Sequence, residues 1–275
     1  MALMGNDVLY SGTGTLPGAA AMPAPQPVLF VGAGPGAAEH LTLAALRAIE
    51  GADVVIHDRL VGPEVMAFVP PAARRVDVGK EGFGPSTTQD AIHDLLVTHA
   101  RTGARVVRLK GGDPSVFARL DEETAALDAA GLDWRVIPGL TAASVAAAAI
   151  GRSLTRRGRN AALRIVTGHD MVGFAEQDWR GLARAGQVAA VYMGKKSARF
   201  IQGRLIMHGA DPFTPVTVVE NVSRTDQRIT AATLSTLPAA AAGAQGPAVI
   251  LLGLAPREAR IALPALRPEP REVRA

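Results

Sequence analysis

The sequence predicts an α/β protein of two domains, and three observations lead to this fold class. The chain has 275 residues, a length that suits one large domain or two medium ones. Hydrophobic residues make up 48% and charged residues 20%, as in globular proteins with a buried core. Five strand-then-helix units follow one another in the first 150 residues, which is typical of a parallel sheet covered on both faces.

The elements of the first domain follow from apolar patterning. Short apolar runs that end at Gly or Pro predict strands, and apolar residues at helical spacing predict helices. We expect strands at residues 28–31, 53–57, 74–78, 105–109 and 134–137. The expected helices are residues 41–49, 91–100, 122–130 and 141–149.

The second domain has a different rhythm, because its strands are too close together for a helix to lie between every pair. This spacing predicts a mixed or antiparallel sheet. The expected strands are residues 163–166, 188–192, 217–220 and 248–252, with a helix at 197–207. We therefore expect an N-terminal tail at 1–26, domains at 27–150 and 151–256, and a C-terminal tail at 257–275.

Composition excludes several classes of function. Lys and Arg total 29 against 25 Asp and Glu, so the net charge of +4 suits a small acidic substrate better than nucleic acid. Aromatic residues, at 4%, are too few for a base-stacking platform. The absence of Cys excludes disulfides and thiolate ligands and favours a reducing compartment, the cytoplasm. No apolar run is long enough for a membrane span, and the His spacing predicts no metal site.

Glycine-bearing loops follow four of the expected strands of the first domain. Because ligands of open α/β sheets bind at the carboxyl ends of the strands, these loops should converge on one site. The alternative is that they are only tight turns. The four loops are residues 32–36, 79–84, 111–114 and 138–141.

The first loop also permits a nicotinamide dinucleotide site. Gly32, Gly34 and Ala37 have the spacing of that motif, and the acidic residues Asp53 and Asp58 follow about 20 residues later. Against this interpretation, Pro35 removes a backbone donor where a pyrophosphate needs one. An NAD oxidoreductase is nevertheless kept as an alternative class of function. A nonenzymatic basic module that binds nucleic acid is a further alternative.

Eight motifs, in order, resemble those of the uroporphyrinogen-III C-methyltransferases of the tetrapyrrole methylase family. The resemblance covers residues from about 28 to 253, and the Arg-Leu-Lys-Gly-Gly-Asp-Pro run separates this enzyme from most relatives that act on later precursors. The motifs are VGAGPG at 31–36, DRLV at 58–61, GK at 79–80, VVRLKGGDPSVF at 106–117, IPGLTAA at 137–143, TGH at 167–169, YMG at 192–194 and VEN at 219–221.

The resemblance implies the tetrapyrrole methyltransferase fold, with two α/β domains and the active site in the cleft between them, in a homodimer. It implies transfer of methyl groups from S-adenosyl-L-methionine to C2 and C7 of uroporphyrinogen III. The products are precorrin-2, formed through precorrin-1, and S-adenosyl-L-homocysteine. Precorrin-2 serves cobalamin and sirohaem biosynthesis, and the sequence leaves both destinations open. A C-methyltransferase of a later precorrin is the alternative.

The same resemblance implies the site residues. Asp58 and Lys80 fall on the acid/base positions of the family. Removal of a proton after methylation gives Asp58 a role as general base. The implied cofactor-binding residues are Pro35, Gly111, Gly112, Asp113, Val116, Thr141, Ala142, Met193, Val222 and Ala248.

Four of these residues also have a simpler interpretation. Asp58 suits a helix cap or turn, and Lys80 suits a solvated loop. Asp113 before a proline suits an Asx-turn, and Met193 is by default a core methionine.

An octa-acid substrate needs cations, and we expect Arg59, Arg156 and Arg157 to bind its carboxylates. Arg156 and Arg157 form a cluster with Arg159, for which a solvated loop is the alternative. The sequence departs from the family pattern at Pro85, at 118–121 including Leu120, at Arg156 and at Val222.

Overall fold

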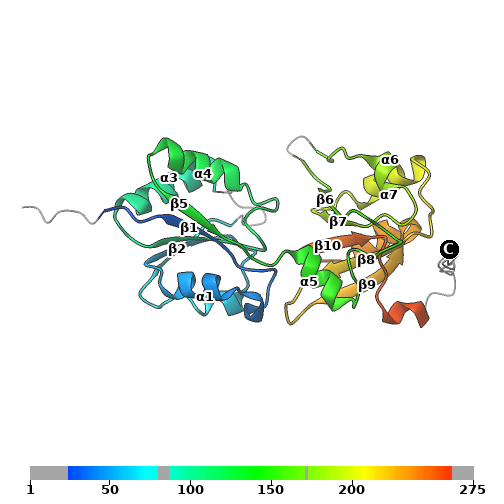
Figure 1. Cartoon of the computed structure of the whole chain (residues 1–275), viewed down its shortest axis with the longest axis horizontal. Coiled ribbons are helices and arrows are strands. Elements are labelled where there is room, and N and C mark those ends of the chain that lie inside the picture. The colour runs from blue at the N-terminus through cyan, green and yellow to red at the C-terminus, as the bar shows by residue number, and fades with distance from the viewer. Residues whose placement is uncertain (1–23, 80–86, 171–172, 262–275) are drawn as a thin grey trace, which may run out of the picture.

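The computed structural model describes residues 24–79, 87–170 and 173–261, which form two lobes that each contain a five-stranded sheet (Figure 1). Within these residues, every helix is too short or too polar to span a bilayer. The chain is of the α/β class that the sequence predicts.

The first sheet is entirely parallel, with strand order β3-β2-β4-β1-β5. Its strands are β1 (Val28–Gly32), β2 (Val54–His57), β3 (Arg74–Asp77), β4 (Val106–Lys110) and β5 (Trp134–Ile137). Parallel pairing brings the carboxyl ends of all five strands to one edge of the sheet. The glycine-bearing loops 32–36, 111–114 and 138–141 follow three of these ends.

Helices cover both faces of the first sheet (Figure 1). On one face, α1 (Leu43–Glu50) and α2 (Pro63–Met66) bury residues such as Ile49 and Val65 against Val55 and Leu109. On the other face, α3 (Gln89–Arg101) and α4 (Leu120–Ala129) pack on the even-numbered residues of β4 and β2. A single 3-10 turn, η1 (Ala38–His40), separates the β1 loop from α1.

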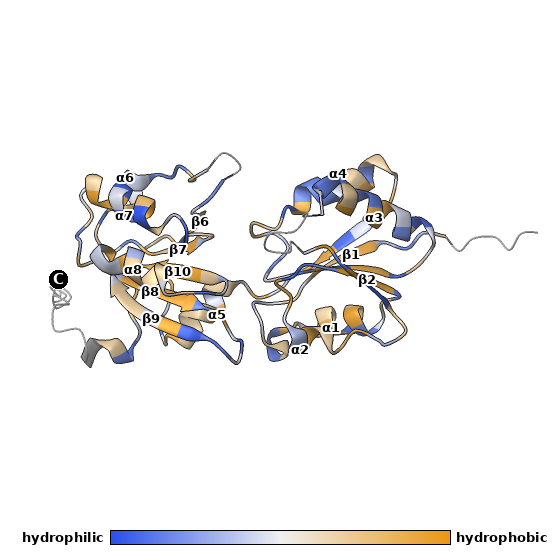
Figure 2. Cartoon of the chain, turned by 180° about the vertical axis from the view of Figure 1, so that it is seen from behind, coloured by the Kyte–Doolittle hydropathy of each residue, from blue (hydrophilic) through white to orange (hydrophobic). Residues whose placement is uncertain are grey.

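The second sheet is mixed, with order β6-β7-β10-β8-β9 and a parallel β6-β7 pair, as the close spacing of its strands predicts. Its mostly hydrophobic strands lie between the helices in Figure 2. The strands are β6 (Arg164–Thr167), β7 (Ala189–Tyr192), β8 (Pro215–Glu220), β9 (Arg228–Thr233) and β10 (Ala248–Leu252).

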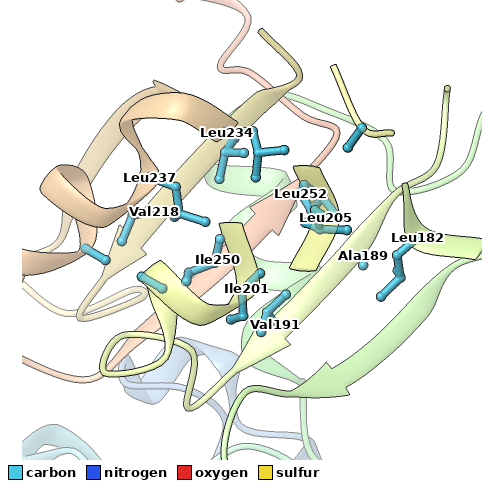
Figure 3. Close-up of a cluster of buried hydrophobic side chains, with 14 of the residues drawn as sticks. Leu182, Ala189, Val191, Ile201, Leu205, Val218, Leu234, Leu237, Ile250 and Leu252 are labelled. Carbon is cyan, nitrogen blue, oxygen red and sulfur yellow. The ribbon is translucent and has the colours of Figure 1, made fainter. Parts of the chain in front are cut away.

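The main core of the second lobe lies between this sheet and three helices (Figure 3). The helices are α6 (Trp179–Leu182), α7 (Ala198–Met207) and α8 (Leu237–Ala242); the 3-10 turns η2 (Leu234–Thr236) and η3 (Glu258–Ile261) complete the lobe. Ile201 and Leu205 of α7 and Leu237 of α8 pack against Val218 and Ile250 of the sheet.

Helix α5 (Ala142–Ala149) packs on the opposite face of the second sheet. Its residues Ala143 and Ala146 lie in one core cluster with Val219 and Leu251. The boundary expected near residue 150 assigns this helix to the first domain, but its buried face contacts the second. The physical reason is that β5 ends at the edge of the first sheet, and the chain leaves through Pro138 and Gly139 before the helix begins.

Candidate functional site

Four glycines bring the loops after β1, β4 and β5 into backbone contact. The N–H of Gly34 donates to the carbonyl of Gly112 over 3.1 Å, and the N–H of Gly112 donates to the carbonyl of Gly34 over 2.8 Å. A Cβ atom at Gly139 would lie 2.3 Å from the carbonyl oxygen of Gly112 and 2.8 Å from the Cα of Gly32. Any larger residue at position 139 would therefore separate the loops.

The Asp113 carboxylate fixes this arrangement. Its Oδ2 accepts a hydrogen bond of 2.9 Å from the N–H of Gly139, which ties the β4 loop to the β5 loop. Its Oδ1 accepts from the N–H of Ser115 over 2.8 Å and from the Ser115 hydroxyl, so the side chain makes the Asx-turn that the sequence also permitted. A cofactor contact by Asp113 stays a prediction.

Gly112 has a positive φ of 78°, and apart from its chain neighbours no described atom lies within 4 Å of the position that a Cβ would take there. A ligand can therefore approach the backbone of the β4 loop closely at this point. Gly111, Gly112, Asp113 and Val116 all belong to this partly buried loop. At the next loop, Thr141 caps α5, because its hydroxyl accepts from the N–H of Ser144.

The second lobe contributes the ends of three strands. Because β10 is antiparallel to both β7 and β8, the carboxyl ends of β7 and β8 lie at the same edge as Ala248, the first residue of β10. Met193 follows β7 with a positive φ of 51° and 51% of its surface exposed, so it is not a core methionine. Val222 follows β8 and is buried.

This edge of the second lobe contacts the glycine loops of the first. The Tyr192 ring lies 5.5 Å from the ring of Phe117 in the β4 loop. Within the second lobe, the Tyr192 hydroxyl accepts from the N–H of Ala143 in α5 over 2.9 Å. Burial raises the pKa of the Tyr192 phenol, which therefore stays neutral.

A second set of contacts joins the segment after β8 to the loops after β1 and β2. The N–H of Ala37 donates to the Ser223 hydroxyl over 3.0 Å, and Nη2 of Arg224 donates to the carbonyl of Leu60 over 2.7 Å. A Cβ atom at Gly36 would lie 2.7 Å from the carbonyl oxygen of Val222. The structure thus brings Pro35, which precedes Gly36, and Val222 to the same junction between the lobes.

Asp58 follows β2 at the same edge and belongs to a buried charged cluster. Nη2 of Arg108 donates to Oδ1 of Asp58 over 2.6 Å, and Arg108 and Lys110 both bond to Glu123 of α4. Burial lowers the pKa of the Lys110 ammonium, and the nearby Arg108 lowers it further. Burial raises the pKa of the Glu123 carboxyl, but Arg108 and Lys110 outweigh burial and keep it below its usual value.

The predicted substrate cations fall into two groups. Arg59 lies at the site edge, because a Cβ at Gly79 would be only 2.4 Å from the Arg59 Cβ. The turn that holds Arg156 and Arg157 lies at the other end of β7 from the site. The Arg159 carbonyl of this turn packs against Gly186, which precedes β7, whereas the site residue Met193 follows β7. Within this chain, the structure does not bring Arg156 and Arg157 to the other site residues, and their role stays a prediction.

Lys80, the second expected acid/base residue, and Pro85 lie outside the described residues. Several residues that the sequence reasoning did not assign to the site line or support it, namely Phe117, Gly139, Tyr192, Arg108, Lys110 and Glu123. A signal was present for two of them, because charged residues in an apolar central strand such as 106–110 are costly unless paired.

The fold and the site define a two-lobed α/β protein whose glycine loops, at the junction of the lobes, leave room against the backbone for a compact ligand. The sequence pattern of the tetrapyrrole (corrin/porphyrin) methylases matches residues 27–238. The chain belongs to this family.

Among relatives, the siroheme synthase of Edwardsiella ictaluri is 46% identical over 226 residues, and that of Tolumonas auensis is 44% identical. The match covers 82% of this chain but only 49% and 48% of those proteins, so the chain spans about half their length.

Solved structures show the same fold. Uroporphyrin-III C-methyl transferase from Thermus thermophilus, complexed with S-adenosyl homocysteine, has a TM-score of 0.72 and 38% identity. The match covers 86% of this chain and all of that one. A cobalt precorrin-4 methyltransferase has a TM-score of 0.73 but 25% identity, with 82% of this chain covered.

Proposed function

We propose that this protein is an S-adenosyl-L-methionine-dependent C-methyltransferase that converts uroporphyrinogen III through precorrin-1 to precorrin-2. The observation that carries the proposal is the convergence of Gly32, Gly112 and Gly139 at the junction where the ends of β7 and β8 meet the first lobe. The greater identity to the Thermus thermophilus enzyme than to the precorrin-4 enzyme favours uroporphyrinogen III over a later precorrin.

The residues present fit this methyl donor, whose nucleoside carries no phosphate. The open space beside Gly112 admits a ligand against the backbone, and the half-exposed Met193 offers an apolar contact. When bound, the donor supplies a methyl group on a positively charged sulfur. The residues proposed to hold it are Pro35, Gly111, Gly112, Asp113, Val116, Thr141, Ala142, Met193, Val222 and Ala248.

The first loop supports this proposal over a dinucleotide. The N–H groups of Gly34 and Gly112 are bonded to each other's carbonyls and cannot also donate to a pyrophosphate. The chain then makes only the turn at 38–40 before α1, which begins at Leu43, so no helix N-terminus follows the loop directly.

The proposed work of the protein is to align a pyrrole carbon with the methyl group and to accept a proton. Methylation would form a carbon–carbon bond while the bond between sulfur and the methyl group breaks and S-adenosyl-L-homocysteine leaves. The positive charge would then lie on the macrocycle and be lost when a neighbouring bridge carbon releases a proton. We assign the acceptance of this proton to Asp58, which is partly exposed at the site edge. We assign the binding of a substrate carboxylate to Arg59, which packs beside Gly79 at the site edge.

Anaerobic incubation of the purified protein with uroporphyrinogen III and S-adenosyl-L-methionine tests the function. We expect the absorbance of precorrin-2 to appear, and S-adenosyl-L-homocysteine but not NADH to give a binding isotherm. Turnover of precorrin-2 in place of uroporphyrinogen III would instead support the later-precorrin alternative.

The Asp58→Asn variant tests the general base. We expect kcat to fall by about 100-fold or more with S-adenosyl-L-homocysteine affinity unchanged. Full turnover by this variant would remove the assignment.

We also propose that the protein is a homodimer in the cytoplasm. Apolar side chains on the edge strand β5, Trp134 at 36% exposure and Val136 at 37%, support a covered surface in the assembled enzyme. Light scattering during gel filtration measures the assembly, and a monomer mass would contradict it.

A further inference from the structure

Three fully buried charges lie beneath Asp58. Arg108 and Lys110 of β4 and Glu123 of α4 each have at most 2% of the side chain exposed. Nε of Arg108 donates to Oε2 of Glu123 over 2.9 Å, and Nζ of Lys110 donates to Oε1 over 2.6 Å. Gln89, the first residue of α3, also donates to Oε1. Glu123 therefore joins β4 to both covering helices.

Four of the five N–H donors of Arg108 are used, from all three nitrogens, which fixes the orientation of its guanidinium. Nη1 donates to the carbonyl of Leu109, and Nη2 donates to both Glu123 and Asp58. Within the described part of the chain, Arg108 is the one donor to the Asp58 carboxylate, and it contacts Oδ1. Among the described residues, no donor contacts the other oxygen, Oδ2.

Stability does not explain this cluster. Burying ions costs free energy, and apolar residues of similar volume often give equal or greater stability. The surrounding face of the sheet is apolar, with Val106, Ile56 and Leu127 in its core. The member of the cluster that reaches solvent is Asp58, whose side chain is 32% exposed at the carboxyl edge of β2. Through Arg108, the buried charges thus contact the residue that is assigned as general base.

We propose that Arg108, held by Glu123, which Lys110 in turn holds, is a positioning residue that orients the Asp58 carboxylate toward the substrate. This inference rests on the proposed function. Arg108 keeps its own proton, and the proton from the substrate passes to Oδ2 of Asp58. Because a displacement of 1 Å can cost about 100-fold in rate, loss of this support should reduce kcat strongly.

The test is a mutant cycle of Arg108→Met and Asp58→Asn. Because Arg108 acts through Asp58, we expect each single change to lower kcat by about 100-fold and the double change to lower it no further. KM for S-adenosyl-L-methionine and the affinity for S-adenosyl-L-homocysteine should not change. Additive losses, or full kcat in Arg108→Met, would overturn the inference.

Removal of Arg108 alone leaves Glu123 underpaired and can unfold the protein. The triple variant Arg108→Met, Lys110→Met and Glu123→Leu removes the whole buried cluster and should fold. We expect it to bind S-adenosyl-L-homocysteine and to show the same loss of kcat; a folded triple variant with wild-type kcat would contradict the positioning role.

A matched control lies at the other end of the same strands. Asp53 and Arg105 form an exposed pair with a 2.7 Å contact, and Arg105→Met and Asp53→Asn should leave kcat unchanged. Absence of methylation by the wild-type protein would contradict the proposed function itself, and that result is distinguishable from an additive cycle in an active enzyme.

Discussion

At the scale of single residues, the site depends on how closely backbones approach. The contact of Gly139 with Gly112 and Gly32 leaves no volume for a methyl group. Asp113 of the β4 loop holds the β5 loop in place through its bond to the N–H of Gly139. The Asp113 side chain and the three glycines therefore set the shape of the loop surface on which the methyl donor is proposed to lie.

The Gly139→Ala variant tests this role. The added methyl group would meet the Gly112 carbonyl, and we expect a loss of about 1–3 kcal/mol of unfolding free energy together with loss of S-adenosyl-L-homocysteine binding. Urea unfolding and calorimetry measure the two effects.

Gly203 provides the matched control, since it lies in α7 with nothing within 4 Å of its Cβ position. Gly203→Ala should raise the unfolding free energy by about 0.5–1 kcal/mol and leave binding intact. Normal binding by Gly139→Ala would show that the loops tolerate separation.

The Asp53–Arg105 pair predicts a pH effect on stability. Hydrogen bonds from Arg105 lower the pKa of the Asp53 carboxyl from 3.8 to about 2. The stabilisation is therefore complete above pH 3.8 and is lost as the pH falls through about 2. Because the pair is exposed, Asp53→Asn should cost only about 0.5–1 kcal/mol at pH 7.

Urea unfolding of wild type and Asp53→Asn at pH 7, 5 and 3 measures this difference. We expect it to be the same at pH 7 and 5 and smaller at pH 3. Asp133→Asn, an exposed change before β5, is the control. A difference that grew toward low pH would contradict the assigned sign.

At the scale of elements, local signals predicted most of the structure. Thr42, Thr88 and Thr141 accept hydrogen bonds from helix N–H groups and cap α1, α3 and α5. Strand β9 was not predicted, because its residues are largely exposed and show no apolar alternation. It exists through pairing with β8, a long-range contact that no short segment encodes.

A hydrogen bond from the segment after β8 should contribute measurably to ligand affinity, because it joins the two lobes. Arg224→Met removes the hydrogen bond to the Leu60 carbonyl, which helps to hold the second lobe against the loop after β2. We expect weaker S-adenosyl-L-homocysteine binding, by about fivefold for a bond of about 1 kcal/mol, with little change in the unfolding of either lobe. Calorimetry measures the affinity.

Arg199→Met, an exposed change on α7, is the control and should bind normally. Equal affinity in Arg224→Met and wild type would show that the contact between Arg224 and Leu60 does not support the site.

At the scale of the whole molecule, the proposed site needs both lobes, and the two Trp residues report on them separately. Trp134 lies on β5 of the first sheet and Trp179 begins α6 of the second lobe. The variants Trp179→Phe and Trp134→Phe each leave one fluorescent reporter.

A ligand held by both lobes should stabilise both. At a concentration of one hundred times its Kd, S-adenosyl-L-homocysteine should add about 2.7 kcal/mol and raise the thermal midpoint seen by each Trp. A shift of the Trp134 signal alone, with Trp179 unaffected, would confine the ligand to the first lobe.

The sequence alone determined the rhythm of strands and helices, the four glycine-bearing loops and the motifs that resemble one enzyme family. These features depend on short-range periodicity and turn chemistry, which a single segment contains. Only the tertiary structure decided that α5 packs on the second sheet, that Arg159 lies at the far end of β7, and that Arg108 reaches Asp58. Those contacts join residues from separate elements, and their distances exist only once the chain has folded.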